Sequence, residues 1–132
     1  MIRNVRSQDA QALVHICKTA LKHETDSVTL EQRIQELSQN EFYYIAVYED
    51  DHDHRVLGFI QAERYNLLYA GNGWNIIALA VDPEAQRQGI GKKLLTALEK
   101  KSFRRTIYFY PLKLQYDPKR STCVLSEHGI HL

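Results

Sequence analysis

The chain has 132 residues, a length that suits one domain with its own hydrophobic core. Hydrophobic residues make up 44% and charged residues 25% of it, as in ordinary soluble globular proteins. The net charge of +1 argues against a protein that binds nucleic acid by neutralising many phosphates. No apolar run reaches the roughly 18 residues of a membrane span, and the first residues lack the apolar segment of a signal peptide. With only two cysteines, Cys17 and Cys123, we expect a cytoplasmic protein with reduced thiols and no membrane or nucleic-acid partner.

Two helices are predicted in the first third of the chain. Apolar residues recur at helical spacing over residues 7–21, with Ser7 as the expected N-cap. Thr29 and Gln32 have the form of a capping box, and apolar residues at helical spacing follow as far as Leu37. A second, shorter helix is therefore expected to begin at this box.

Aromatic and β-branched residues predict three strands in the middle of the chain. Residues 42–49 and 56–64 are expected to pair as an antiparallel hairpin, with a polar turn over residues 49–54. That turn contains Asp and His, which are metal-ligand types, but a solvated turn is the favoured interpretation and no metal is expected. The G-N-G sequence of residues 71–73 predicts another turn, and the apolar run 74–81 suits a central strand covered on both faces.

A third helix is predicted from residue 88 to about residue 101, after an Asp82-Pro83 stop signal. The order β, α, α, β, β, β, α predicts a single α+β domain over residues 1–132. Its helices would cover both faces of a twisted, mixed and mostly antiparallel sheet. Beyond residue 102, short strands are expected over residues 106–110, 112–116 and 122–125.

The loop between the central strand and the third helix reads Q-R-Q-G-I-G over residues 86–91. A diphosphate needs several donors that point to one place, and the first turn of a helix offers free N–H groups with a partial positive charge. Gly89 and Gly91 would let the backbone approach phosphate oxygens closely, and Arg87 and Lys92 would add charge. Taken alone, a Gly-x-Gly before a helix is equally consistent with a tight strand-to-helix turn.

The stretch from Asn75 to Leu98 resembles the central motif of the GNAT superfamily of N-acetyltransferases, written Q/R-x-x-G-x-G/A. Gln86, Gly89 and Gly91 match its three fixed positions, and L-A-V-D-P directly before it is the family's usual strand ending. The resemblance implies a GNAT-like fold with a bulged central strand, whose backbone pairs with the pantetheine arm of acetyl-CoA, followed by amides that hold the pyrophosphate. The cofactor-binding residues expected from it are Leu79, Ala80, Val81, Arg87, Gln88, Gly89, Ile90, Gly91 and Lys92.

The resemblance also implies a reaction, in which a primary amine of a small molecule or peptide attacks acetyl-CoA directly within a ternary complex. Some family members place a glutamate base at the start of the central strand, and that position here is Asn75. An amide is no base, although it could hold a water that relays the proton. The alternative is a strand-end asparagine bonded to backbone, so the catalytic residues are left unassigned.

The family-like part covers about residues 1–101, and residues 102–132 form a divergent tail. Only 31 residues follow Lys101, which leaves no room for the family's ordinary fourth helix, so the carboxy-terminal elements are expected to be incomplete. No residue there matches the tyrosine that protonates the leaving thiolate in the family. The alternative to an active enzyme is therefore a catalytically impaired CoA-binding or structural remnant. A further possibility is a homodimer, in which a second chain completes the domain through an open sheet edge.

Overall fold

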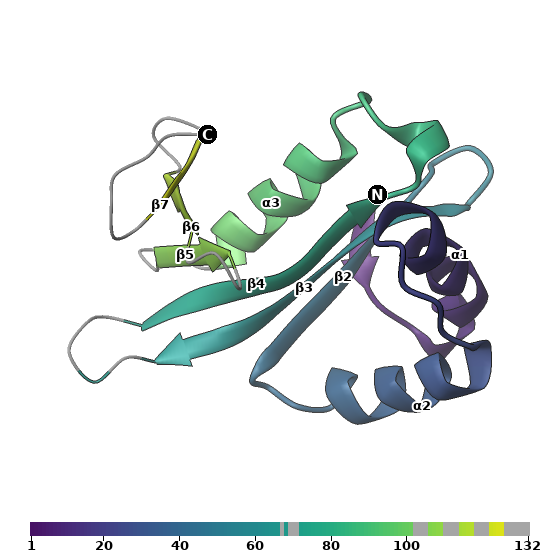
Figure 1. Cartoon of the computed structure of the whole chain (residues 1–132), viewed down its shortest axis with the longest axis horizontal. Coiled ribbons are helices and arrows are strands. Elements are labelled where there is room, and N and C mark those ends of the chain that lie inside the picture. The colour runs from purple at the N-terminus through teal and green to yellow at the C-terminus, as the bar shows by residue number, and fades with distance from the viewer. Residues whose placement is uncertain (67, 69–71, 102–105, 110–113, 118–121, 126–132) are drawn as a thin grey trace.

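The computed structural model describes residues 1–66, 68, 72–101, 106–109, 114–117 and 122–125. Figure 1 shows its elements, with α3 and the strands after it at the carboxy-terminal end. In chain order they are β1 (Ile2–Asn4), η1 (Ser7–Asp9), α1 (Ala10–Ala20), α2 (Ser27–Ser38), β2 (Tyr43–Glu49), β3 (Val56–Asn66), β4 (Asn72–Val81), η2 (Pro83–Ala85), α3 (Ile90–Lys101), β5 (Thr106–Phe109), β6 (Leu114–Asp117) and β7 (Thr122–Leu125).

One sheet runs through the whole molecule, in the order β1-β2-β3-β4-β5-β6-β7. Neighbouring strands are antiparallel except for β4 and β5, which are parallel. A parallel pair needs a long crossover connection, and α3 provides it between β4 and β5. The expected mixed, mostly antiparallel sheet is thereby confirmed.

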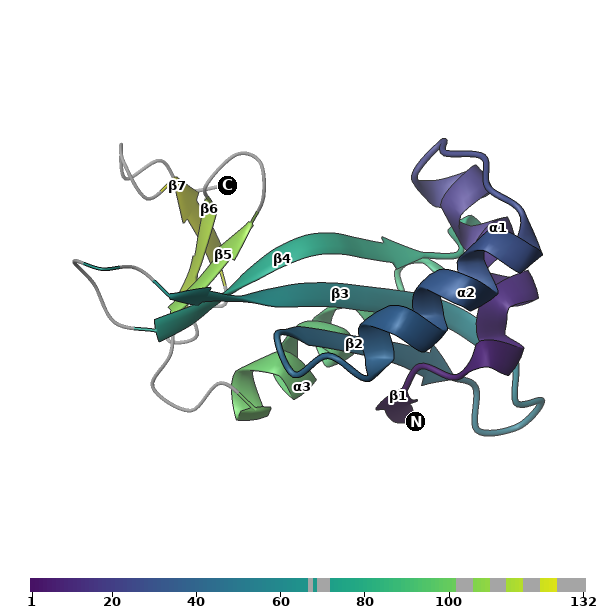
Figure 2. The ribbon, with the colours of Figure 1, turned by 90° about the horizontal axis from the view of Figure 1, so that it is seen from below.

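The helices lie on both faces of this sheet, as predicted. Figure 2 shows α1 and α2 on one side of the strands and α3 on the other. Each face has its own apolar cluster, in which alternate residues of β2, β3 and β4 point to opposite sides. In the described part of the chain, no helix is long and apolar enough to span a membrane.

Both predicted helix starts are wrong in detail. Ser7 lies in η1, and the Asp9 carboxylate accepts the Arg6 amide at 2.8 Å, so this turn is capped by its own last residue and Ser7 is not the N-cap. At the second helix, Asp26 has an extended backbone and its Oδ1 accepts the Thr29 amide at 2.8 Å. The aspartate side chain reaches that amide directly, so the helix begins at Ser27 and Thr29 lies inside it.

The predicted 71–73 turn is also wrong where the structure describes it. Asn72 and Gly73 belong to β4 and pair with Asn66 and Tyr65 of β3. Pairing with β3 extends β4 toward its amino-terminal end, because the hydrogen bonds between the two strands outweigh the turn preference of a single glycine. Gly71 lies outside the described residues. The strands predicted after residue 102 are confirmed as β5, β6 and β7, apart from end residues such as Tyr110 and Leu112, which also lie outside them.

Candidate active site

A bulge divides β4 into two halves. Gln61 of β3 pairs with Ala78, whereas the next residue of β3, Ala62, pairs with Ile76, so Ile77 is the extra residue on β4. The parallel strand β5 pairs with β4 only from Gly73 to Ile76, and Figure 1 shows it beside the outer part of β4 alone. Among the described residues, β4 beyond the bulge is therefore paired on the β3 side only. The backbone from residue 77 to residue 81 presents a sheet edge to which an extended molecule could add.

The loop that follows β4 is tied down at its start. The amide of Asp82 donates to the Leu57 carbonyl at 2.8 Å, and the Asp82 carboxylate, which is almost fully buried, accepts the Glu84 amide at 3.0 Å. The Gln86 Nε2 donates to the Val81 carbonyl at 3.3 Å. These bonds hold the exit of the strand, so the chain turns at a defined place toward α3.

Two residues of the loop have left-handed backbone angles, Arg87 with φ of 68° and Gly89 with φ of 79°. The first α3 bond runs from the Lys93 amide to the Gly89 carbonyl at 3.0 Å. Within the part of the chain that the structure describes, no hydrogen bond is donated by the backbone amides of residues 87–92. Successive free amides at a helix N-terminus form a concave, electropositive site suited to phosphate oxygens.

The side chains around Gly89 and Gly91 leave space beside these amides. A Cβ at Gly89 would meet no atom within 4 Å, and one at Gly91 would meet only Val81 Cγ2 at 3.8 Å. Packing within the protein therefore does not require glycine at position 91. A ligand that approaches the backbone closely would require it.

Gly58 of β3, which is not among the residues predicted from the sequence, brings α3 close to the sheet. A Cβ at this position would lie 3.0 Å from the Ala80 carbonyl oxygen and 3.2 Å from Ile90 Cγ2. Only a glycine lets the first turn of α3 pack this closely on β3 and β4. A glycine inside an otherwise β-branched and aromatic strand is the signal that could have indicated it.

The predicted cofactor residues divide into those with exposed and those with packed side chains. The exposed side chains are those of Arg87, Gln88 and Lys92. Ile90 is buried in the α3 cluster, Ala80 is buried on the opposite face, and Leu79 and Val81 pack against the α3 cluster. Any contact that Leu79 to Val81 and Ile90 make with a cofactor would thus come from their backbone, as the family resemblance implies.

Asn75 is buried on β4, with 6% of its surface exposed. It lies opposite Glu63 of β3, and its Nδ2 donates to Glu63 Oε1 at 3.0 Å. The structure thus gives Asn75 a carboxylate partner. No sequence pattern indicates Glu63, because its pairing with Asn75 depends on the register of two strands.

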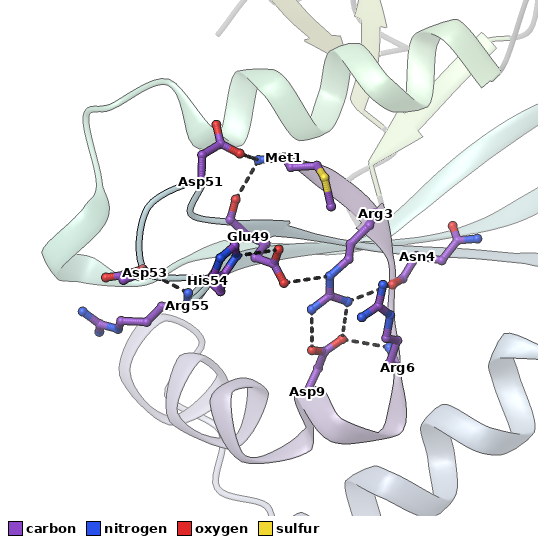
Figure 3. A network of polar contacts seen from close by, with 10 residues as sticks. All are labelled: Met1, Arg3, Asn4, Arg6, Asp9, Glu49, Asp51, Asp53, His54 and Arg55. Atoms are coloured by element: carbon purple, nitrogen blue, oxygen red, sulfur yellow. Dashed lines mark hydrogen bonds and ion pairs between the residues drawn. The ribbon is translucent and has the colours of Figure 1, made fainter.

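A second charged cluster lies at the β1 edge of the sheet (Figure 3). Arg3 makes two bonds to the Asp9 carboxylate, at 2.8 and 2.9 Å, and one to Glu49 Oε1 at 3.1 Å. The hydrogen bond to Asp9 is the main cause that raises the pKa of Arg3, and the bond from Arg3 lowers the pKa of Glu49. The Arg3 guanidinium donates to a carboxylate of η1 and to a carboxylate of β2. The cluster therefore links β1, η1 and β2, and we assign it a structural role.

The turn of the first hairpin is held by hydrogen bonds between its own residues. The Asp50 Oδ1 accepts the amides of His52 at 2.8 Å and Asp53 at 3.3 Å, as in a solvated Asx turn. These hydrogen bonds lower the pKa of Asp50. Among the residues that the structure describes, no group of three or more His, Cys, Asp or Glu could hold a metal ion.

The fold and the loop can be compared with known proteins. The sequence model of the Acetyltransferase (GNAT) family matches residues 8–119. A GNAT family acetyltransferase from Staphylococcus aureus subsp. aureus USA300_TCH1516 is 16% identical, with 83% of each chain covered and a TM-score of 0.67. Glucosamine-6-phosphate N-acetyltransferase from Arabidopsis thaliana is 17% identical, covering 83% of this chain and 80% of that one, with a TM-score of 0.69.

Ribosomal-protein-alanine N-acetyltransferase from Brucella melitensis is 18% identical over 83% of this chain and 72% of that one, with a TM-score of 0.65. No curated protein matches the sequence. Identities this low show a common fold and nothing finer, whereas the family match spans most of the residues. The chain therefore belongs to the GNAT family of acetyltransferases.

Proposed function

We propose that this protein is an N-acetyltransferase that transfers the acetyl group of acetyl-CoA to a primary amine. One observation carries the proposal: the free edge of β4 beyond the bulge leads directly into a loop whose amides, from residue 87 to residue 92, have no partner among the described residues. The edge suits an extended, amide-containing arm, and the loop suits a diphosphate. Acetyl-CoA carries both groups in one molecule.

The proposed binding residues act mainly through their backbone. Leu79, Ala80 and Val81 pair with the pantetheine arm, while Arg87, Gln88, Gly89, Ile90, Gly91 and Lys92 surround the pyrophosphate. Acetyl-CoA supplies an activated thioester, and the proposed step is direct attack of the amine on it, with no covalent enzyme intermediate. The contribution of the chain is to hold amine and thioester together and to exclude water, and a backbone amide near Leu79 polarises the carbonyl as in an oxyanion hole.

The acceptor is proposed only as a class, a primary amine on a small molecule or a peptide. Structural neighbours carry names as different as glucosamine-6-phosphate N-acetyltransferase and ribosomal-protein-alanine N-acetyltransferase. A common fold at this level of identity does not choose between such acceptors. We further propose a cytoplasmic enzyme that needs neither nucleic acid nor membrane, because its charge is balanced and its composition is that of a soluble protein.

Isothermal titration calorimetry with acetyl-CoA, followed by a thiol-release assay over a panel of amines, tests the proposal. We expect acetyl-CoA and CoA to bind well below millimolar concentration, and at least one amine to release free CoA thiol. No binding at millimolar concentration would contradict the assignment of the loop. Binding without thiol release from any amine would instead support the alternative, a CoA-binding domain without turnover.

A further inference from the structure

Glu63 and Asn75 form a polar pair between strands whose neighbouring residues are apolar. Ala62 and Ile76, the adjacent residues on β3 and β4, are both buried in the α3 cluster. Because side chains alternate along a strand, Glu63 and Asn75 point to the opposite face, the one that α1 and α2 cover nearer the other end of these strands. Both views show the outer ends of β3 and β4 extending beyond these two helices.

The pair lies close to the place where β4 loses its β5 neighbour. Asn75 is two residues before the bulge residue Ile77, so their positions are roughly 6 to 7 Å apart along the strand. The side chain of Glu63 is only partly buried, whereas Asn75 is almost completely buried. The buried amide thus fixes one carboxylate oxygen of Glu63. Among the described residues no group bonds the other oxygen, which is available to a ligand on this face.

We propose that Glu63 is the catalytic residue that takes the proton from the acceptor amine, and that Asn75 is the positioning residue that orients its carboxylate. This inference rests on the proposed function, because it places the acceptor on the α1 and α2 face and the thioester at the opening beyond Ile77. The base, Glu63, then lies on β3. The strand that precedes the loop, β4, supplies only the side-chain amide of Asn75, which orients the base.

The proton and electron balance of the step is simple. The ammonium form of the acceptor gives one proton to the Glu63 carboxylate, directly or through one water. The neutral nitrogen attacks the thioester carbonyl carbon, the C–N bond forms, and the C–S bond breaks with its electron pair passing to sulfur. The nitrogen loses its second proton to water, the CoA thiolate takes up one proton from the same water, and Glu63 releases its own to solvent, so each turnover releases one proton.

Other carboxylates near β4 are less suited to this role. Asp82 accepts the Glu84 amide at 3.0 Å and lies 3.4 Å from His15 Nε2, so both of its oxygens have partners. It also lies beyond the far end of β4, at the entrance to the loop. Glu84 is exposed in η2 on the same loop, at the proposed pyrophosphate end of the cofactor.

The test compares two small acceptors that differ in protonation. Methylamine is almost entirely protonated at neutral pH and must lose a proton before it attacks, whereas hydroxylamine is mostly neutral. For Glu63→Gln, whose amide oxygen can still accept the bond from Asn75, we expect kcat/KM for methylamine to fall about 100-fold and that for hydroxylamine to fall far less. Asn75→Ala should lower the same methylamine-to-hydroxylamine ratio, while the Kd for acetyl-CoA stays unchanged in both variants.

Glu31→Gln removes the same charge from an exposed position on α2 and serves as the matched control, with both rates unchanged. An equal loss for the two amines in Glu63→Gln, or a loss below about threefold with methylamine, would overturn the inference. A wild-type protein that binds acetyl-CoA but acetylates neither amine would overturn it too, while leaving the proposed cofactor site in place. Absence of acetyl-CoA binding in calorimetry would be the separate failure of the proposed function itself.

Discussion

The two faces of the sheet differ in how they use polar groups. The α3 face is packed by apolar side chains, and in the described structure the Trp74 indole N–H and Glu99 Oε1 of α3 are buried without a hydrogen-bond partner. Of the described residues, three polar ones are buried, and none belongs to that cluster. Asp9 bonds to Arg3, Asn75 bonds to Glu63, and Asp82 lies beside His15 of α1.

This difference indicates that the two faces of the sheet have different roles. The apolar face gives the loop at the start of α3 a rigid support, so that its backbone amides are held in place without charged side chains beneath them. The opposite face carries paired charges, and a charged acceptor would bind and lose its proton there.

Replacing Trp74 with alanine should damage the apolar face most. The indole is 2% exposed, and its loss is expected to lower the free energy of unfolding by about 3–5 kcal/mol, measured by urea denaturation. Trp74→Phe is the matched control and should stay within about 1 kcal/mol, because it also removes a buried N–H that has no partner among the described residues. A small effect of the alanine variant would show that this face is not the main apolar support.

The buried ion pair on the other face should respond nearly as strongly. Asp9→Ala leaves the Arg3 guanidinium with Glu49 as its remaining carboxylate, and the expected loss of stability is roughly 3 kcal/mol. Asp51→Ala breaks an exposed pair with the amino terminus, and should change stability by less than about 1 kcal/mol. Equal effects of the two variants in urea titrations would refute the idea that charges on this face are structurally important.

Gly91→Ala should separate cofactor binding from folding. The new Cβ meets only Val81 at 3.8 Å, so the variant should be as stable as the wild type or more stable by up to about 1 kcal/mol. If the pyrophosphate approaches the backbone at this point, the same methyl group should weaken acetyl-CoA binding about tenfold, or about 1.4 kcal/mol. Calorimetry and thermal unfolding on one preparation measure both, and unchanged affinity would remove Gly91 from the proposed site.

The smallest effect is expected at the start of α2, in the pH dependence of stability. Hydrogen bonds from Thr29 lower the pKa of Asp26 in the folded protein. Its stabilising effect is therefore fully present above the ordinary carboxyl range and disappears as the pH falls through the lowered pKa. The Tm difference between the wild type and Asp26→Asn, whose cap does not titrate, should shrink on acidification, and a constant difference would contradict this cap.

Much of the site could be predicted from sequence because its signals are local. The spacing of Gly89 and Gly91 after a strand and before an apolar-periodic helix indicates the loop within a few residues of chain. The helical periodicity of the first two helices and the strand at residues 122–125 were predicted for the same reason. Helix starts were predicted less well, because several short polar side chains compete for the same amides and only the backbone shows which one bonds.

The sequence by itself determined the order of the elements, the apolar periods and the loop motif, since each depends on residues that are neighbours in the chain. Tertiary structure alone decided where β5 stops pairing with β4, that Ile77 is the bulge residue, and that Gly58 lies under α3. It also decided that Glu63 meets Asn75. Register between strands depends on contacts between distant segments, and a shift of one residue would have moved either side chain to the other face of the sheet.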